Sequence, residues 1–128
     1  MVTEITQGVK ISVEVFYQPE YSRAQENYHM YAYRVTIENR SDSTVQLLSR
    51  HWNIFDSDGT RRQVQGEGVV GEQPILQPNE THQYVSGCNL NTEIGQMRGT
   101  YRMQKLSDGR DFDVSIPPFD LVSTQKLN

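Results

Sequence analysis

The sequence has little of what would cross-link a chain or attach it to a membrane. Its only cysteine is Cys88, so neither an internal disulfide nor a zinc site of clustered cysteines can form. Long apolar runs are absent, and the first 20 residues carry charges within their apolar part, which argues against a signal peptide and a membrane span. We therefore expect a protein of the reducing cytoplasm that makes no contact with membranes.

An excess of positive charge is also absent. The chain has 12 Lys and Arg against 16 Asp and Glu, which gives a net charge of -4. Arg98 and Arg102 alternate with Tyr101 and Met103, and a basic, aromatic sheet face of this kind can bind nucleic acid. Because the overall charge repels phosphate backbones, we expect a solvated outer face with Tyr101 and Met103 in the core, and no nucleic-acid partner.

The third absence is helical periodicity. Apolar residues instead alternate with polar ones over 9–15, 31–37 and 112–116, which is the pattern of half-buried strands. Turn-forming residues separate the segments at 39–43, 56–59 and 107–109. This spacing predicts an all-β chain, an immunoglobulin-like or fibronectin type III-like β-sandwich of about seven antiparallel strands. Pro117 and Pro118 predict that the last strand lies at a sheet edge.

The length of 128 residues predicts a single domain with a core of its own. No internal repeat or low-complexity segment divides it. We expect short flexible tails at about 1–8 and 122–128.

One segment matches a nucleotide-binding pattern. Gly66-Glu67-Gly68-Val69-Val70-Gly71 has the spacing G-x-G-x-x-G. In dinucleotide-binding folds this pattern opens a helix, but here Pro74 and Pro78 follow, so we expect no such cofactor.

Three interpretations of the loop stay open. The glycines can serve a tight crossing between two sheets. Their N–H groups can bind a small anion, such as pyrophosphate or a dinucleoside polyphosphate, with help from Arg61 or Arg62. The loop can also recognise a protein, in which case Glu67, Val69 and Val70 should be exposed.

No constellation of residues indicates catalysis. Cys88 and His82 form the only thiol–imidazole pair close together in the sequence, and no recognisable motif flanks either residue. We predict that the protein is not an enzyme and has no cofactor. His51 and His82 are weak candidates for direct binding of a divalent cation.

Four segments together resemble the ApaG family. They are HWNIFDSDG at 51–59, VQGEGVVGEQPILQP at 64–78, QYVSG at 83–87 and GQMRGTYRM at 95–103. The resemblance extends over nearly the whole chain, and the run at 64–78 is its most specific part because no general turn rule demands that string.

The resemblance implies a fibronectin type III-like sandwich in a bacterial cytoplasmic protein. It links the chain to cobalt tolerance and magnesium efflux, and to an inferred pyrophosphate or nucleotide role for Gly66, Gly68 and Gly71. Related domains in F-box and polymerase-interacting proteins suggest protein interaction. We therefore expect an interaction module whose partner is another protein, with a homodimer through a sheet edge as a further expectation.

Overall fold

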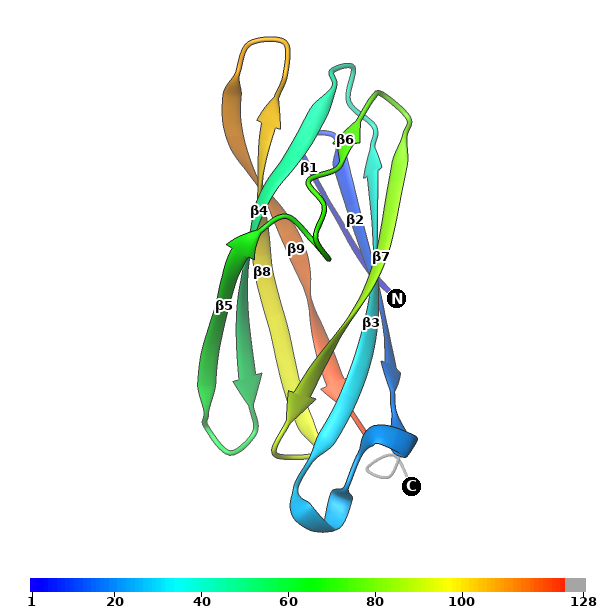
Figure 1. Cartoon of the computed structure of the whole chain (residues 1–128), viewed down its shortest axis with the longest axis vertical. Coiled ribbons are helices and arrows are strands. Elements are labelled where there is room, and N and C mark those ends of the chain that lie inside the picture. The colour runs from blue at the N-terminus through cyan, green and yellow to red at the C-terminus, as the bar shows by residue number, and fades with distance from the viewer. Residues whose placement is uncertain (124–128) are drawn as a thin grey trace.

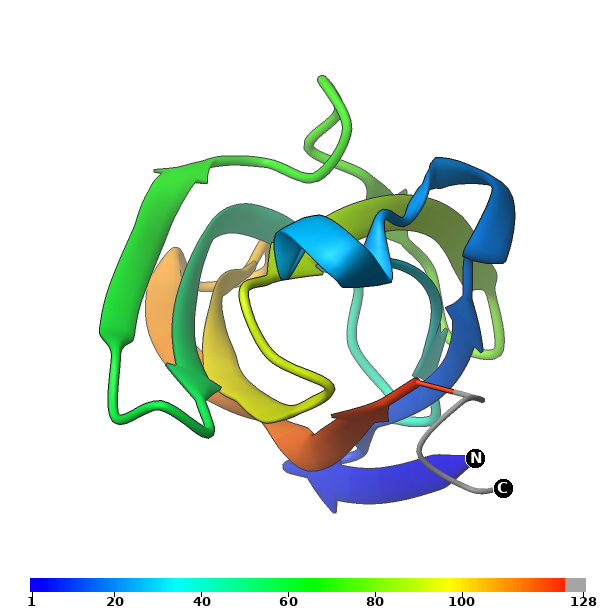
Figure 2. The same cartoon turned by 90° about the horizontal axis from the view of Figure 1, so that it is seen from below.

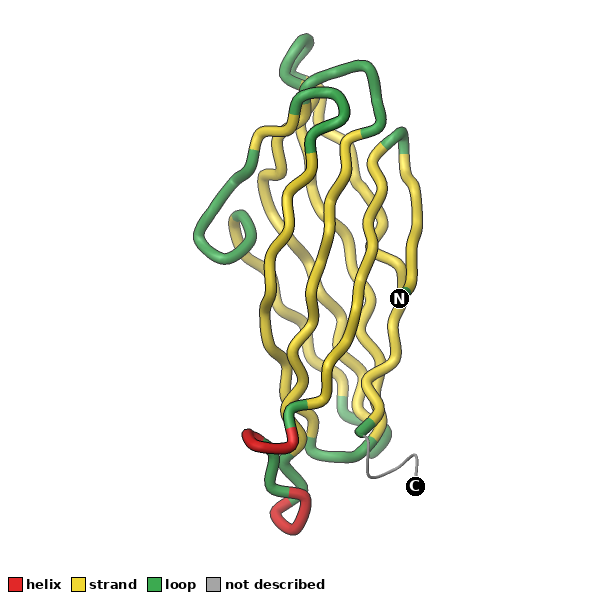
Figure 3. Tube along the Cα trace, turned by 90° about the vertical axis from the view of Figure 1, so that its right-hand side faces the viewer, coloured by secondary structure: helices red, strands yellow, loops and turns green. Residues whose placement is uncertain are grey.

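The computed structural model describes residues 1–123, and strands make up most of that length (Figure 1). In chain order the strands are β1 (Val2–Thr6), β2 (Val9–Tyr17), β3 (His29–Asn39), β4 (Val45–Asp56), β5 (Arg61–Glu67), β6 (Ile75–Leu76), β7 (Thr81–Leu90), β8 (Ile94–Lys105) and β9 (Arg110–Val122). Two short 3-10 turns, η1 (Pro19–Tyr21) and η2 (Ala24–Glu26), lie in the connection between β2 and β3, at one end of the molecule (Figure 3). No helix within residues 1–123 has the length and apolarity needed to cross a membrane.

The strands form two antiparallel sheets that face each other. The first sheet has the order β1-β2-β3-β7, and the second has the order β5-β4-β8-β9 with β6 paired to the start of β4. Seen along the long axis in Figure 2, the two sheets enclose a common interior. The prediction of an immunoglobulin-like or fibronectin type III-like β-sandwich is confirmed.

Alternation along the strands builds the core. In β3 every second residue is buried from His29 to Asn39, because that face points at the second sheet. Trp52 of β4 lies at the centre, with its ring centroid 5.5 Å from that of Tyr33 and 5.8 Å from that of Phe119. Aromatic contacts of this kind stabilise the fold beyond the area they bury. Tyr101 and Met103 are buried, as the sequence predicted.

The structure differs from the prediction in the number and limits of the strands. Residues 1–123 contain nine strands where about seven were predicted, because β1 and β6 were not expected. The predicted flexible tail at 1–8 contains β1, which is held by pairing with β2 from Val2↔Val13 to Thr6↔Val9. At the other end of the chain, β9 continues to Val122, and residues 124–128 of the predicted tail lie outside the described residues.

The two seams of the sandwich, where one sheet meets the other, are built differently. On one side β9 packs beside β1 and β2, and the Ser115 N–H donates a hydrogen bond of 3.2 Å to Thr6 Oγ1. Pro117 and Pro118 lie in β9 at this seam, where the pairing with β8 shifts register between Met97 and Gly99. The predicted edge strand is therefore confirmed, and the bulge accommodates the two missing N–H groups.

The other seam, the open seam, separates β5 from β7, and no ladder joins these two strands. Instead, the segment between β5 and β6 crosses it (Figure 1). The glycine loop predicted from the sequence belongs to this segment.

Candidate functional site

A bulge in β4 anchors the loop that follows β5. The pairing of β4 with β8 shifts register between Leu47 and Ser49, which turns the Leu48 carbonyl out of the ladder. That carbonyl accepts hydrogen bonds from the Gly68 N–H and from Gln73 Nε2, both at 2.9 Å. The loop is thus fastened to β4 before and after its tip.

The tip is a two-residue hairpin turn. Val69 and Glu72 exchange backbone hydrogen bonds of 2.8 and 3.0 Å, and the two residues between them, Val70 and Gly71, have φ angles of 47° and 77°. Positive φ at both central positions defines a type I′ turn, which usually contains Asn-Gly. At Gly68 a Cβ atom would lie 2.3 Å from the Glu72 carbonyl oxygen, so this position requires glycine for close approach.

The two valines of the loop have opposite environments. Val69 is 1% exposed and belongs to the hydrophobic core, so the prediction of an exposed Val69 is wrong. The physical reason is that the turn must be held against the open seam, and an apolar side chain pointing inward does this. Val70 is 63% exposed, and Glu67 is exposed, as predicted.

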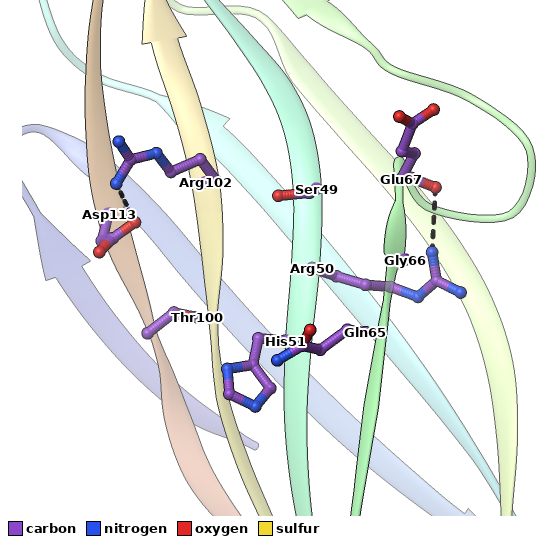
Figure 4. Close-up of a pocket in the computed structure, with 9 residues that line it drawn as sticks. All are labelled: Ser49, Arg50, His51, Gln65, Gly66, Glu67, Thr100, Arg102 and Asp113. Atoms are coloured by element: carbon purple, nitrogen blue, oxygen red, sulfur yellow. Dashed lines mark hydrogen bonds and ion pairs between the residues drawn. The ribbon is translucent and has the colours of Figure 1, made fainter.

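A cation that the sequence did not single out lies against the loop. Arg50 of β4 reaches behind β5, and its Nη1 donates hydrogen bonds to the carbonyls of Glu67 (3.0 Å) and Gly68 (2.9 Å) (Figure 4). A Cβ atom on Gly66 would lie 3.0 Å from this guanidinium. Gly66 therefore leaves room for Arg50, and two of the three pattern glycines serve packing within the chain.

The two arginines proposed as anion contacts lie away from the loop. Gly66 pairs with Arg50, whereas Arg62 pairs with Ile54, four residues further along β4. At about 3.3 Å per residue, this separation is about 13 Å. Arg62 Nη2 donates to Cys88 Sγ at 3.4 Å and to the carbonyl of Asn89, and the Arg61 guanidinium lies 5.3 Å from the centroid of the Phe55 ring.

Several backbone N–H groups that an anion site would need already donate hydrogen bonds within the chain. The N–H groups of Gly68, Val69 and Glu72 all donate to carbonyls of the chain. The structure thus brings neither Arg61 nor Arg62 to the loop, and it engages three of the loop amides. Anion binding at Gly66–Gly71 stays a prediction, and Arg50 replaces Arg61 and Arg62 as the cation nearest to it.

The two histidines considered for metal binding are far apart in the topology. His51 lies on the outer face of β4, with Nε2 3.3 Å from Gln63 Oε1, and His82 lies on β7 in the other sheet, 3.6 Å from the Glu72 carboxylate. Among residues 1–123, no three His, Cys, Asp or Glu side chains group in a way that could hold a metal ion.

The outer face of the second sheet carries a shallow polar hollow of about 520 Å³ (Figure 4). Two arginines line it: Arg50, which donates to the loop carbonyls, and Arg102, which pairs with Asp113 at 3.2 Å and Asp111 at 3.7 Å. The face is solvated, as the sequence predicted for this strand.

Cys88 is 6% exposed at the end of β7, and burial raises the pKa of its thiol. The nucleophilic thiolate is therefore disfavoured at neutral pH. His82 lies six positions away along the same strand, so the two side chains form no catalytic pair.

Comparisons with known proteins identify the family. The model of the ApaG domain matches residues 19–105. The chain belongs to the ApaG family. Protein ApaG of Brucella canis is 48% identical over 121 residues, covering 94% of this chain and 92% of the relative, and that of Brucella abortus is 47% identical over the same shares.

Solved structures agree with this family assignment. The crystal structure of the putative ApaA protein from Bordetella pertussis superimposes with a TM-score of 0.88 at 42% identity, covering 91% of this chain and 94% of that one. The C-terminal domain of wzt, at 10% identity and a TM-score of 0.54, shares only the fold.

Proposed function

We propose that this ApaG-family chain is a non-enzymatic interaction module that presents the turn Val69–Glu72 to a partner protein. The observation that carries the proposal is Val70. A β-branched residue at positive φ is a backbone outlier, and such strain costs about 1–3 kcal/mol. Its side chain is 63% exposed, so packing inside the chain does not account for it.

The rest of the loop supports this role. Arg50, the Leu48 carbonyl and buried Val69 hold the turn rigidly, which lowers the entropy cost of binding. An exposed apolar tip on a rigid scaffold is a common arrangement for recognition. We place the protein in the cytoplasm, in line with its single reduced cysteine, and we expect any effect on cobalt tolerance or magnesium efflux to pass through the partner.

The substitution Val70→Asn tests the proposal. Asn adopts positive φ more readily than Val, so V70N should raise the free energy of unfolding by about 0.5–1 kcal/mol in urea titrations. The same change removes the apolar tip, so the immobilised variant should lose, at least tenfold, proteins that the unsubstituted chain captures from a bacterial lysate.

The matched control is Ile94→Asn, another exposed apolar residue, at the start of β8. It should leave capture unchanged. If V70N is stabilised but captures the same proteins in the same amounts, the turn is not the recognition element.

A further inference from the structure

The far edge of β7 has unpaired backbone groups. The Asn39 N–H donates to the Glu80 carbonyl, so these two residues form a hydrogen-bonded pair. Such pairs recur at every second residue of an antiparallel ladder, so the backbone N–H and C=O groups of the even-numbered residues of β7 point at β3. Odd-numbered residues of β7 therefore point the other way, and the contact of Arg62 with the Asn89 carbonyl lies on that side. Within residues 1–123, no strand pairs with this side of β7, so the backbone groups of Gln83, Val85 and Gly87 face the open seam.

Arg62 contacts the Asn89 carbonyl and the Glu72 carboxylate contacts His82, at the two ends of this edge. Between these contacts the edge lacks the charges, prolines and bulges that usually protect against strand addition. Natural edges carry charges, prolines or bulges, or are covered. β9 contains Pro117 and Pro118 and packs beside β1, while β5 begins with two arginines. The stretch of β7 from 83 to 89, QYVSGCN, has no charged residue and no proline, and its pairing with β3 is regular.

The exposed face next to the edge is partly apolar. Val85 is 57% exposed and lies opposite Arg34 of β3. The Arg34 guanidinium lies 5.4 Å from the centroid of the Phe16 ring, and Phe16 is 42% exposed. Aromatic and Arg side chains are enriched in interfaces.

Two guanidinium groups border the same seam. Arg50 donates to the carbonyls of Glu67 and Gly68, and Arg62 to Cys88 and to the Asn89 carbonyl. Within residues 1–123, neither forms an ion pair with a carboxylate, although the chain as a whole has a net charge of -4. Arg50 of β4 pairs with Gly66, which lies four residues from Arg62 along β5. This separation of about 13 Å matches residues i and i+4 of an extended strand.

We propose that β7 binds an extended, acidic segment of a partner protein as an added strand along Gln83–Asn89. Backbone hydrogen bonds to residues 83, 85 and 87 supply affinity. Acidic side chains of the segment, spaced i and i+4, pair with Arg50 and Arg62, and an apolar side chain on its other face contacts Val85. The inference rests on the proposed function, because it names a second surface and a class of partner for an interaction module.

Amide hydrogen exchange measured by NMR tests the strand directly. In the free protein the amides of 83, 85 and 87 should exchange rapidly, whereas those of 84, 86 and 88 should be protected. Adding the peptide acetyl-Glu-Val-Thr-Val-Glu-amide at millimolar concentration should slow exchange at 83, 85 and 87 at least tenfold. The control peptide, with Lys in place of both Glu, should not.

Substitutions separate the backbone contribution from the charges. Val85→Pro removes an N–H that bonds nothing inside the chain, so the fold should persist while affinity for the acidic peptide falls at least tenfold. The matched control Val85→Thr keeps the N–H and should bind within threefold of the unsubstituted chain. Arg62→Gln should weaken binding about threefold to tenfold and reduce its salt dependence, and Arg62→Lys should restore part of both. The Arg62 variants keep the test decisive if V85P does not fold.

Three outcomes would overturn the inference: equal binding of the Lys peptide, no exchange protection along 83–87 at saturation, or protection that rises with protein concentration alone. The last outcome would show that a second copy of the chain occupies the edge. V70N should leave peptide binding unchanged. If V70N loses capture and the unsubstituted chain binds no peptide, the turn is a recognition element and the edge of β7 is not. If V70N keeps capture and the peptide binds along β7, only the proposal for the turn is overturned.

Discussion

The two seams of this sandwich show how differently one fold can close its sides. At the seam between β1 and β9, strand packs directly beside strand, and the Ser115 N–H bonds Thr6 across it. At the seam between β5 and β7, the closure consists of arginine side chains and a clamped loop. Side chains and loops can be displaced at lower cost than a packed strand, so the second seam is the side suited to exchange contacts with a partner.

The largest expected effect is a loss of stability at alkaline pH. Tyr84 and Tyr101 hydrogen-bond each other through their hydroxyls across the interior, and burial raises the pKa of both phenols and of Tyr33. In the unfolded chain these phenols titrate near 10. Above that pH the folded state holds protons that the unfolded state has released, so the free energy of unfolding falls as pH rises.

Burial raises the pKa of the Tyr31 phenol as well. Above pH 10 each of these four phenols lowers the free energy of unfolding by up to about 1.4 kcal/mol per pH unit, and the four together by up to about 5–6 kcal/mol per unit. Below pH 9 the contribution should be constant. Urea titrations between pH 8 and 11, with tyrosinate absorbance recorded in parallel, measure both quantities. A flat stability curve up to pH 11 would contradict the burial of these phenols.

A smaller effect is expected from Gly68→Ala at the open seam. The added Cβ would lie 2.3 Å from a backbone oxygen at a φ of 64°, so the free energy of unfolding should drop by about 2–3 kcal/mol. Gly71→Ala is the matched control, since its Cβ meets nothing within 4 Å, and it should lose about 1 kcal/mol from positive φ alone. Equal losses in urea denaturation would mean that the clamp on Glu72 does not constrain the loop.

The smallest effect belongs to the packed seam. Thr6→Val removes the acceptor for the Ser115 N–H and keeps the shape of the side chain, so the loss should be about 1 kcal/mol. Faster amide exchange at Ser115, with unchanged exchange in β7, would show that the two seams open independently. Faster exchange at both would contradict their separation.

The sandwich could be predicted because the alternation of apolar and polar residues along a strand reflects which of its side chains are buried. The same pattern also indicates two bulges. Apolar positions are odd-numbered at Val45 and Leu47 but even-numbered at Trp52 and Ile54, and a one-residue change of this kind requires a bulge between them. The parity changes again across Pro117 and Pro118, where the second bulge lies.

The candidate site was less predictable. Arg50 falls on the inward face only once the bulge at Leu48 is known, so a reading of local pattern assigns it to solvent. The burial of Val69 depends on a turn whose first central residue is Val, whereas the sequence rules for such turns expect Asn or Asp. Both features follow from tertiary contacts between β4 and a loop that begins 20 residues later.

The buried thiol at the end of β7 allows the local opening of the open seam to be measured. Cys88 is shielded by its own strand and by Arg62, so a thiol-specific reagent can reach it only during a local opening of that edge. Since it is the only cysteine in the chain, the rate at which the reagent labels the protein reports how often this edge opens locally.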